Sequence, residues 1–106
     1  MNKIKYEVVR DLLPVRTAIG SLSTDSKAKV EIALRTLETN PEPDDYGCER
    51  IEDQVFKIRV PVQDGEISVL YDLWRADRKV VLIEIKDVSW FREAKAWVGG
   101  LLDFGP

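Results

Sequence analysis

Apolar and polar residues alternate along much of this chain, and that period predicts β-strands. Residues 3–9 alternate between charged and apolar side chains before two valines, which is typical of a strand. Three further segments alternate or are almost wholly apolar: 55–62, 67–75 and 79–86. Short turns separate these three, and the first turn holds the Asp64-Gly65 pair that favours tight hairpins. We therefore expect an antiparallel meander, and we expect the most apolar segment, 79–86, to be a central strand of the sheet.

A helical period marks the segments between and after these strands. Residues 25–39 carry an apolar stripe, with cap-forming side chains before it and Asn40-Pro41 after it. The stripe consists of Val30, Ala33, Leu34 and Leu37. A weaker signal predicts a helix from Asp11, as its cap, to about Leu22. Residues 87–106 return to helical spacing with heavy aromatic side chains.

Together these segments predict an α+β fold in a single domain over residues 1–106. Its order is an N-terminal strand, two helices, a three-stranded antiparallel meander and a C-terminal helical extension over residues 87–106. The 106 residues are 44% hydrophobic and 33% charged, which suits one modest core.

Composition narrows the possible chemistry. The chain has no histidine and one cysteine, Cys48, so Ser-His and Cys-His catalysis, the usual zinc sites and an internal disulfide are excluded. We expect no cofactor and no metal, because the acidic residues of the 40–48 loop lack the ligand spacing of a calcium loop. The start lacks the apolar stretch of a signal peptide and no segment suits a membrane span, so we expect a cytoplasmic protein.

Lys57 and Arg59 are the best functional clue in the sequence. Because side chains alternate along a strand, both lie on one face, about 7 Å apart. Two cations at that spacing can hold adjacent phosphates or stabilise charge while a phosphate is cleaved. The alternative is an ordinary solvated sheet face. The net charge of −3 argues against a large nucleic-acid footprint but leaves room for a local basic patch.

Three other side chains allow two interpretations each. Lys86, at the end of its strand, either joins the basic pair or is a solvated strand end. Arg50, before the basic strand, either joins the patch or is ordinary surface. Tyr71 carries a hydroxyl but shares the apolar register of its strand, so it is either a core residue or a functional one.

Four segments follow one another in a characteristic order. They are Ala33–Pro41, with its leucines and closing Asn-Pro; Phe56–Val60, which alternates basic residues with an aromatic and apolar ones; Val69–Tyr71; and Val80–Lys86. In this order they resemble the RelE/ParE superfamily of toxins from bacterial toxin–antitoxin systems, and the similarity spans about residues 4–87.

The resemblance implies two candidate activities. RelE-like members cut mRNA in the ribosomal A site, where the ribose 2′-hydroxyl attacks the adjacent phosphate. For this branch the resemblance implies catalytic roles for Lys57, Arg59 and Lys86, and RNA contacts for Lys57, Arg59 and Arg50. ParE-like members inhibit DNA gyrase without that cleavage.

This sequence departs from the RelE pattern at two places. Ser68 or the neighbouring Ile67 lies in the region where the family usually has an arginine, and Asp87 follows Lys86 where a tyrosine or histidine is usual. The alternatives are therefore a non-enzymatic gyrase inhibitor and a degenerate member that only binds its antitoxin. A small sheet domain of unrelated function is a third possibility.

The aromatic C-terminal stripe also allows two interpretations. Trp90, Phe91 and Trp97 either pack on the chain's own sheet or form a surface that a partner fills. The resemblance implies a cognate antitoxin as that partner, and the ribosome and mRNA as further partners. The sequence predicts no oligomeric state.

Overall fold

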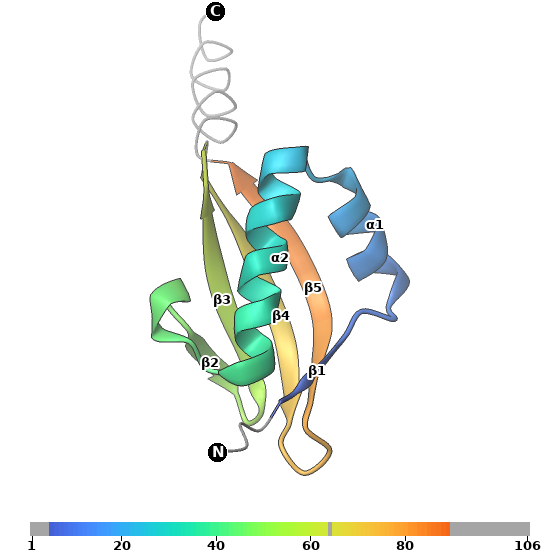
Figure 1. The fold of residues 1–106 in the computed structure, drawn as a ribbon, viewed down its shortest axis with the longest axis vertical. Helices are drawn as coiled ribbons and strands as arrows, with labels where there is room; N and C mark the ends of the chain where they lie inside the picture. Colours follow the sequence, from blue (N-terminus) through green and yellow to red (C-terminus); the bar gives the residue numbers. More distant parts are fainter. Residues whose placement is uncertain (1–4, 64, 90–106) are drawn as a thin grey trace, which may run out of the picture.

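The computed structural model of the protein describes residues 5–63 and 65–89, which form one mixed sheet with two α-helices against it (Figure 1). The elements are β1 (Glu7–Val9), α1 (Leu13–Ser21), α2 (Thr24–Thr39), the short 3-10 helix η1 (Asp44–Tyr46), β2 (Glu49–Glu52), β3 (Val55–Val62), β4 (Gly65–Trp74) and β5 (Lys79–Ser89). The α+β class, the two helices and the three-stranded meander agree with the sequence prediction.

The strands lie in the order β1-β5-β4-β3-β2. Neighbouring strands from β2 to β5 are antiparallel, whereas β1 pairs with β5 in parallel. Strand β5, the segment expected to be central, lies inside the sheet between β4 and β1, and β4 holds the middle position. Parallel pairing of β1 with β5 needs a long connection, and here that connection includes both helices and strands β2, β3 and β4.

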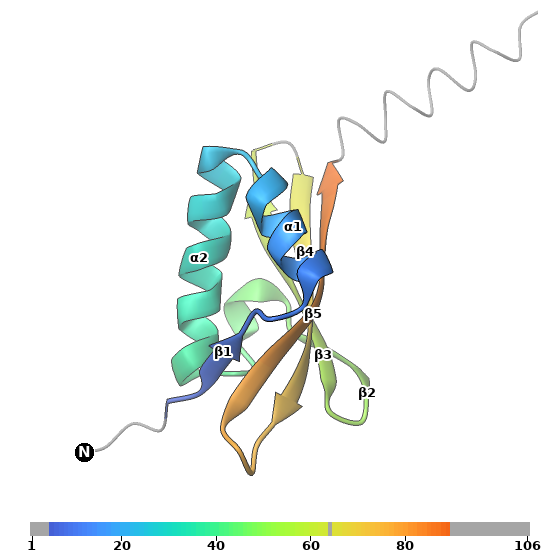
Figure 2. The same ribbon diagram turned by 90° about the vertical axis from the view of Figure 1, so that its right-hand side faces the viewer.

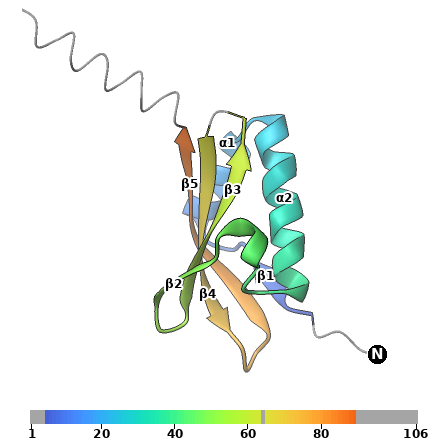
Figure 3. The same cartoon turned by 90° about the vertical axis from the view of Figure 1, so that its left-hand side faces the viewer.

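Both helices lie on the same side of the sheet (Figures 2 and 3). Helix α2 packs against β3 and β1, and α1 packs against β5. The hydroxyl of Ser23 caps α2 by accepting a hydrogen bond from the Ser26 amide at 3.2 Å. For α1, the expected cap at Asp11 was wrong: the helix begins after Leu12, whose side chain makes no capping bond, and Pro14 fills the first turn.

The core lies between the helices and one face of the sheet. Alternate residues of β3 and β4 are buried in it, as their period predicts: Phe56, Ile58, Val60, Ile67, Val69, Tyr71 and Leu73. The whole apolar stripe of α2 is buried against them. A shift of one residue in either strand would turn its apolar side chains toward solvent, so the core determines the register.

Several features differ from the sequence prediction. Strand β2 was not predicted; it is fully exposed and pairs only with the first residues of β3. Gly65 pairs with Val62, so it begins β4 and is not part of the turn. Strand β5 extends past Lys86 to Ser89. The predicted C-terminal helix, with Trp90, Phe91 and Trp97, lies outside the described residues.

Candidate functional site

The sheet face opposite α1 and α2 carries the three side chains predicted to be catalytic. We call it the open face and define it by Lys57 and Arg59 of β3 and Lys86 of β5. Arg59 pairs with Ser68 of β4, and Ser68 pairs in turn with Lys86, so Arg59 and Lys86 lie in one row across the sheet, and Lys57 lies on the same face two residues before Arg59. With strands about 4.8 Å apart, the backbones of Arg59 and Lys86 are about 10 Å apart.

A β-bulge in β5 places Lys86 on this face. Leu70 pairs with Glu84 while Tyr71 pairs with Leu82, so Ile83 is an extra residue in β5. Before the bulge the buried positions are Val80 and Leu82, and after it the buried position is Ile85. The inserted residue reverses the alternation, which turns Lys86 away from the core and onto the same side as Arg59.

Two glutamates from neighbouring strands hold Arg59. Its Nη2 lies 3.4 Å from Oε2 of Glu49 on β2, and its Nε lies 3.8 Å from Oε1 of Glu66 on β4. The Arg59 side chain is 46% exposed, so solvent reaches both ion pairs. Sequence analysis did not single out either glutamate, because the contacts depend on the pairing of three strands.

Lys57 has different neighbours. Its strand partners are Glu49 on β2 and Leu70 on β4, and its side chain is half-buried. Within residues 5–63 and 65–89, neither Lys57 nor Lys86 forms an ion pair. These two amines therefore remain available for an external anion, whereas Arg59 has internal partners.

Acidic side chains are interleaved with the basic ones across the open face. By register, acidic side chains of several strands lie there, among them Glu49, Glu66, Asp72 and Glu84. One oxygen of Asp72, Oδ1, is buried without a hydrogen-bond partner among the described residues. The face therefore alternates in charge and is not a continuous basic surface.

Arg50 lies apart from the three basic side chains. It pairs with Phe56, a residue of the buried register, and its Nε donates a hydrogen bond to the Asp53 carbonyl at 2.7 Å. There it lines a cleft of about 650 Å³ beside the β4–β5 turn, together with Trp74 and Arg75. The structure therefore does not bring Arg50 onto the open face, and its predicted RNA contact would come from a separate surface.

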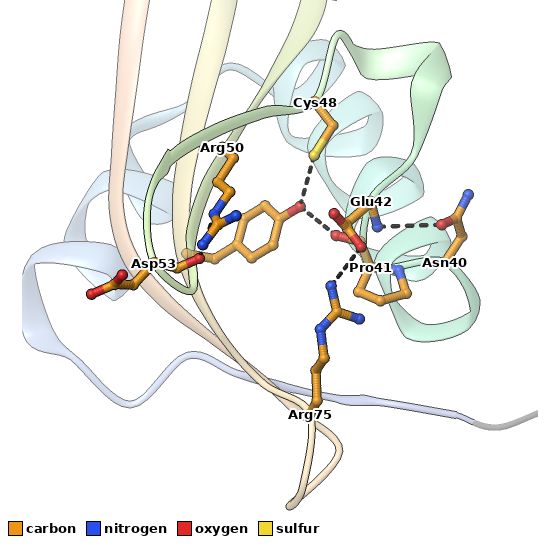
Figure 4. A network of polar contacts seen from close by, with 8 residues as sticks. Asn40, Pro41, Glu42, Cys48, Arg50, Asp53 and Arg75 are labelled. Carbon is orange, nitrogen blue, oxygen red and sulfur yellow. Dashed lines mark hydrogen bonds and ion pairs between the residues drawn. The ribbon is translucent and has the colours of Figure 1, made fainter.

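Tyr71 is buried on the opposite side of the sheet, in a polar network at the end of the core (Figure 4). Its hydroxyl donates to the Pro41 carbonyl at 2.5 Å and lies 3.4 Å from the Cys48 sulfur. Burial raises the pKa of the Tyr71 phenol and of the Cys48 thiol. Because its ring stacks on Phe56 inside the core, Tyr71 cannot donate a proton on the open face.

The acidic loop after α2 is a structural connection. Glu42 forms an ion pair with Arg75 at 2.5 Å, and its amide donates to the Asn40 side chain at 3.2 Å. Figure 4 shows these contacts beside the tyrosine network. In the part of the chain that the structure describes, no three His, Cys, Asp or Glu side chains gather as metal ligands do, and no helix is long and apolar enough to cross a membrane.

Comparison with known proteins shows a likeness of fold. No protein-family model matches the sequence, and no curated protein matches it. A chain of the archaeal RelE–RelB complex from Pyrococcus horikoshii OT3 superposes with a TM-score of 0.64 at 20% identity, covering 83% of this chain and 98% of that one. A mutant of the E. coli toxin RelE in the free state superposes with a TM-score of 0.62 at 13% identity, covering 78% and 83%. The described domain thus has the RelE fold.

Proposed function

We propose that this protein is the toxin of a toxin–antitoxin pair and acts as a RelE-type, ribosome-dependent mRNA endonuclease in the cytoplasm. The observation that carries the proposal is the open face: the three basic side chains singled out from the sequence lie together on the sheet side that α1 and α2 leave uncovered. The likeness to RelE toxins supports the same assignment. A cognate antitoxin is the proposed partner, because one of the similar structures is a RelE–RelB complex.

The geometry suits a limited kind of chemistry. Lys57 and Lys86 would neutralise the scissile phosphate and the charge that develops on it, and Arg59 would orient it through a bidentate contact. The 2′-hydroxyl of the substrate itself would be the nucleophile, so no nucleophilic side chain of this protein is needed. No tyrosine or histidine is present on the described open face, so one of the two lysines, in its neutral form, would take the proton of the 2′-hydroxyl, which leaves the other lysine and Arg59 to neutralise the phosphate.

The charge of the open face also supports a second candidate function. Glu49 and Glu66 neutralise Arg59, and among the described residues the acidic side chains of the face outnumber the basic ones. A surface of alternating charge suits a protein partner better than a polyanion. This supports a non-enzymatic member that inhibits gyrase as ParE-like proteins do, or one that only binds its antitoxin. Trp90, Phe91 and Trp97 remain the proposed antitoxin contacts.

A growth assay tests whether the open face causes toxicity. Inducible expression of the protein should arrest growth, and Lys57→Ala with Arg59→Ala should relieve the arrest because the phosphate contacts are lost. The matched control is Lys27→Ala with Arg35→Ala, which removes one lysine and one arginine from the exposed surface of α2. We expect the control to stay as toxic as the parent. A double variant of the open face that arrests growth as strongly as the parent would contradict the proposal.

A further inference from the structure

We propose that Glu49 and Glu66 set the affinity of the open face for phosphate by occupying Arg59 as internal anions. The inference rests on the proposed function, because it assumes that Arg59 contacts RNA. It assigns a role to two carboxylates that lie next to the basic row without belonging to it.

The first argument is that the two glutamates occupy one particular edge of the Arg59 guanidinium. Glu49 approaches Nη2 and Glu66 approaches Nε. These two nitrogens form one edge of the guanidinium, and that edge is a bidentate binding site for phosphate or carboxylate. A phosphate oxygen that comes to this edge must therefore displace the glutamates.

The second argument is that the two glutamates come from both sides of Arg59. Glu49 is on β2 and Glu66 is on β4, the two neighbours of β3. In register, Glu49 lies opposite Lys57 and Glu66 lies opposite Pro61, so each is one diagonal step from Arg59. The sheet itself thus holds one carboxylate on either side of the guanidinium.

The third argument is that this arrangement can open. Both contacts are long, at 3.4 and 3.8 Å, and the side chains of Arg59 and Glu49 are about half exposed. Exposed ion pairs are weak and screened by salt. The glutamates therefore lower the affinity for phosphate without abolishing it, which restricts Arg59 to phosphates that other contacts already hold in place.

The inference can be tested by RNA binding. The probe is a fluorescein-labelled single-stranded RNA of twelve nucleotides, followed by anisotropy across a series of salt concentrations. Glu49→Gln with Glu66→Gln should tighten binding about three- to tenfold, the range that two weak exposed pairs allow. The slope of log affinity against log salt should steepen by about 0.7, the value for one additional phosphate contact on a single strand.

Two controls separate release of Arg59 from a general change of charge. Glu52→Gln with Glu84→Gln removes the same charge from β2 and from the open face but touches no described partner of Arg59. It should change affinity by less than twofold. In an Arg59→Ala background the gain from Glu49→Gln with Glu66→Gln should disappear. If the double variant does not fold, the single variants Glu49→Gln and Glu66→Gln replace it in the binding assay. Each should give a smaller gain in affinity than the double variant.

The outcomes distinguish this inference from the proposed function. A gain that persists without Arg59, an equal gain in the control pair, or no gain would overturn the role of the glutamates. In those cases, wild-type binding that Arg59→Ala weakens would still support RNA contact by the open face. Absence of RNA binding by every variant would overturn the role of the glutamates, and the growth assay would then judge the proposed function, because that function acts on mRNA in the ribosome.

Discussion

Arg59 and Lys57 lie two residues apart on one strand, yet their surroundings give them different properties. Arg59 already has carboxylate partners, whereas Lys57 is half-buried beside Leu70 and has no ion pair among the described residues. An amine without a carboxylate partner is the better candidate for contact with an external phosphate. At the residue scale, Lys57 is therefore the side chain on which the proposed chemistry depends most.

Tyr71 illustrates a residue whose hydroxyl stabilises the fold. Tyr71→Phe removes the hydrogen bond to the Pro41 carbonyl and leaves that acceptor without its partner. We expect a loss of about 1–2 kcal/mol in the free energy of unfolding, measured by urea denaturation. The control is Tyr46→Phe, at a half-buried tyrosine packed against the same core. An equal effect of the two substitutions would show that the Tyr71 hydroxyl contributes no specific stability.

At the scale of the elements, a bidentate ion pair between Arg10 and Glu31 attaches the segment after β1 to helix α2. Arg10 Nη1 and Nη2 contact the two carboxylate oxygens of Glu31 at 2.5 and 2.8 Å. The hydrogen bonds from Arg10 hold the pKa of Glu31 below its ordinary value. This contact links the N-terminal edge of the sheet to the helix that covers the core, two parts of the chain that are not adjacent in sequence.

Acid should weaken this link. The folded-state pKa of Glu31 is lower than its unfolded value, so the pair contributes its full stability above the unfolded pKa of about 4.3 and loses it as pH falls through the folded pKa. Glu31→Gln should cost under about 1 kcal/mol at pH 7, because both side chains are about one-third exposed.

Urea unfolding at pH 7 and at pH 3 measures the effect. The difference in stability between the wild type and Glu31→Gln should shrink at pH 3. Glu52→Gln, at an exposed residue with no ion pair in the described part of the chain, should match the wild type at both pH values. A Glu31→Gln deficit that is as large at pH 3 as at pH 7 would contradict the ion-pair account.

The elements differ in how far sequence could predict them. Helix α2 and strands β3 and β4 carry strong periods, and their buried faces are as predicted. Strand β2 has no such period, because it is an exposed edge strand formed by pairing with β3. The parallel pairing of β1 with β5 joins distant segments, so a local pattern contains no information about it.

The same limit applies to the candidate site. Alternation within β3 was enough to place Lys57 and Arg59 on one face. Lys86 needed the bulge at Ile83, since simple alternation with Val80 and Leu82 would have turned it toward the core. The position of Glu66 beside Arg59 could have been predicted by pairing residues outward from the β3–β4 turn. The position of Glu49 depends on the pairing of β2, which the sequence did not reveal.

The described molecule combines a RelE fold with a surface of mixed charge on the open face. Its helices bury one face of the sheet, and the basic row lies on the other, interleaved with acidic side chains. The basic side chains support the proposed RNA cleavage and the acidic side chains support the alternative of a protein-binding member, whereas the fold by itself decides neither. The fate of mRNA in cells that express the protein separates these two functions.

The most direct test is to map mRNA ends after brief induction. The account predicts new ends inside coding regions, positioned at the ribosomal A site and dependent on translation, which decline strongly with Lys57→Ala and Arg59→Ala but persist with Lys27→Ala and Arg35→Ala. Growth arrest with intact mRNA would contradict the endonuclease function and favour a non-enzymatic inhibitor.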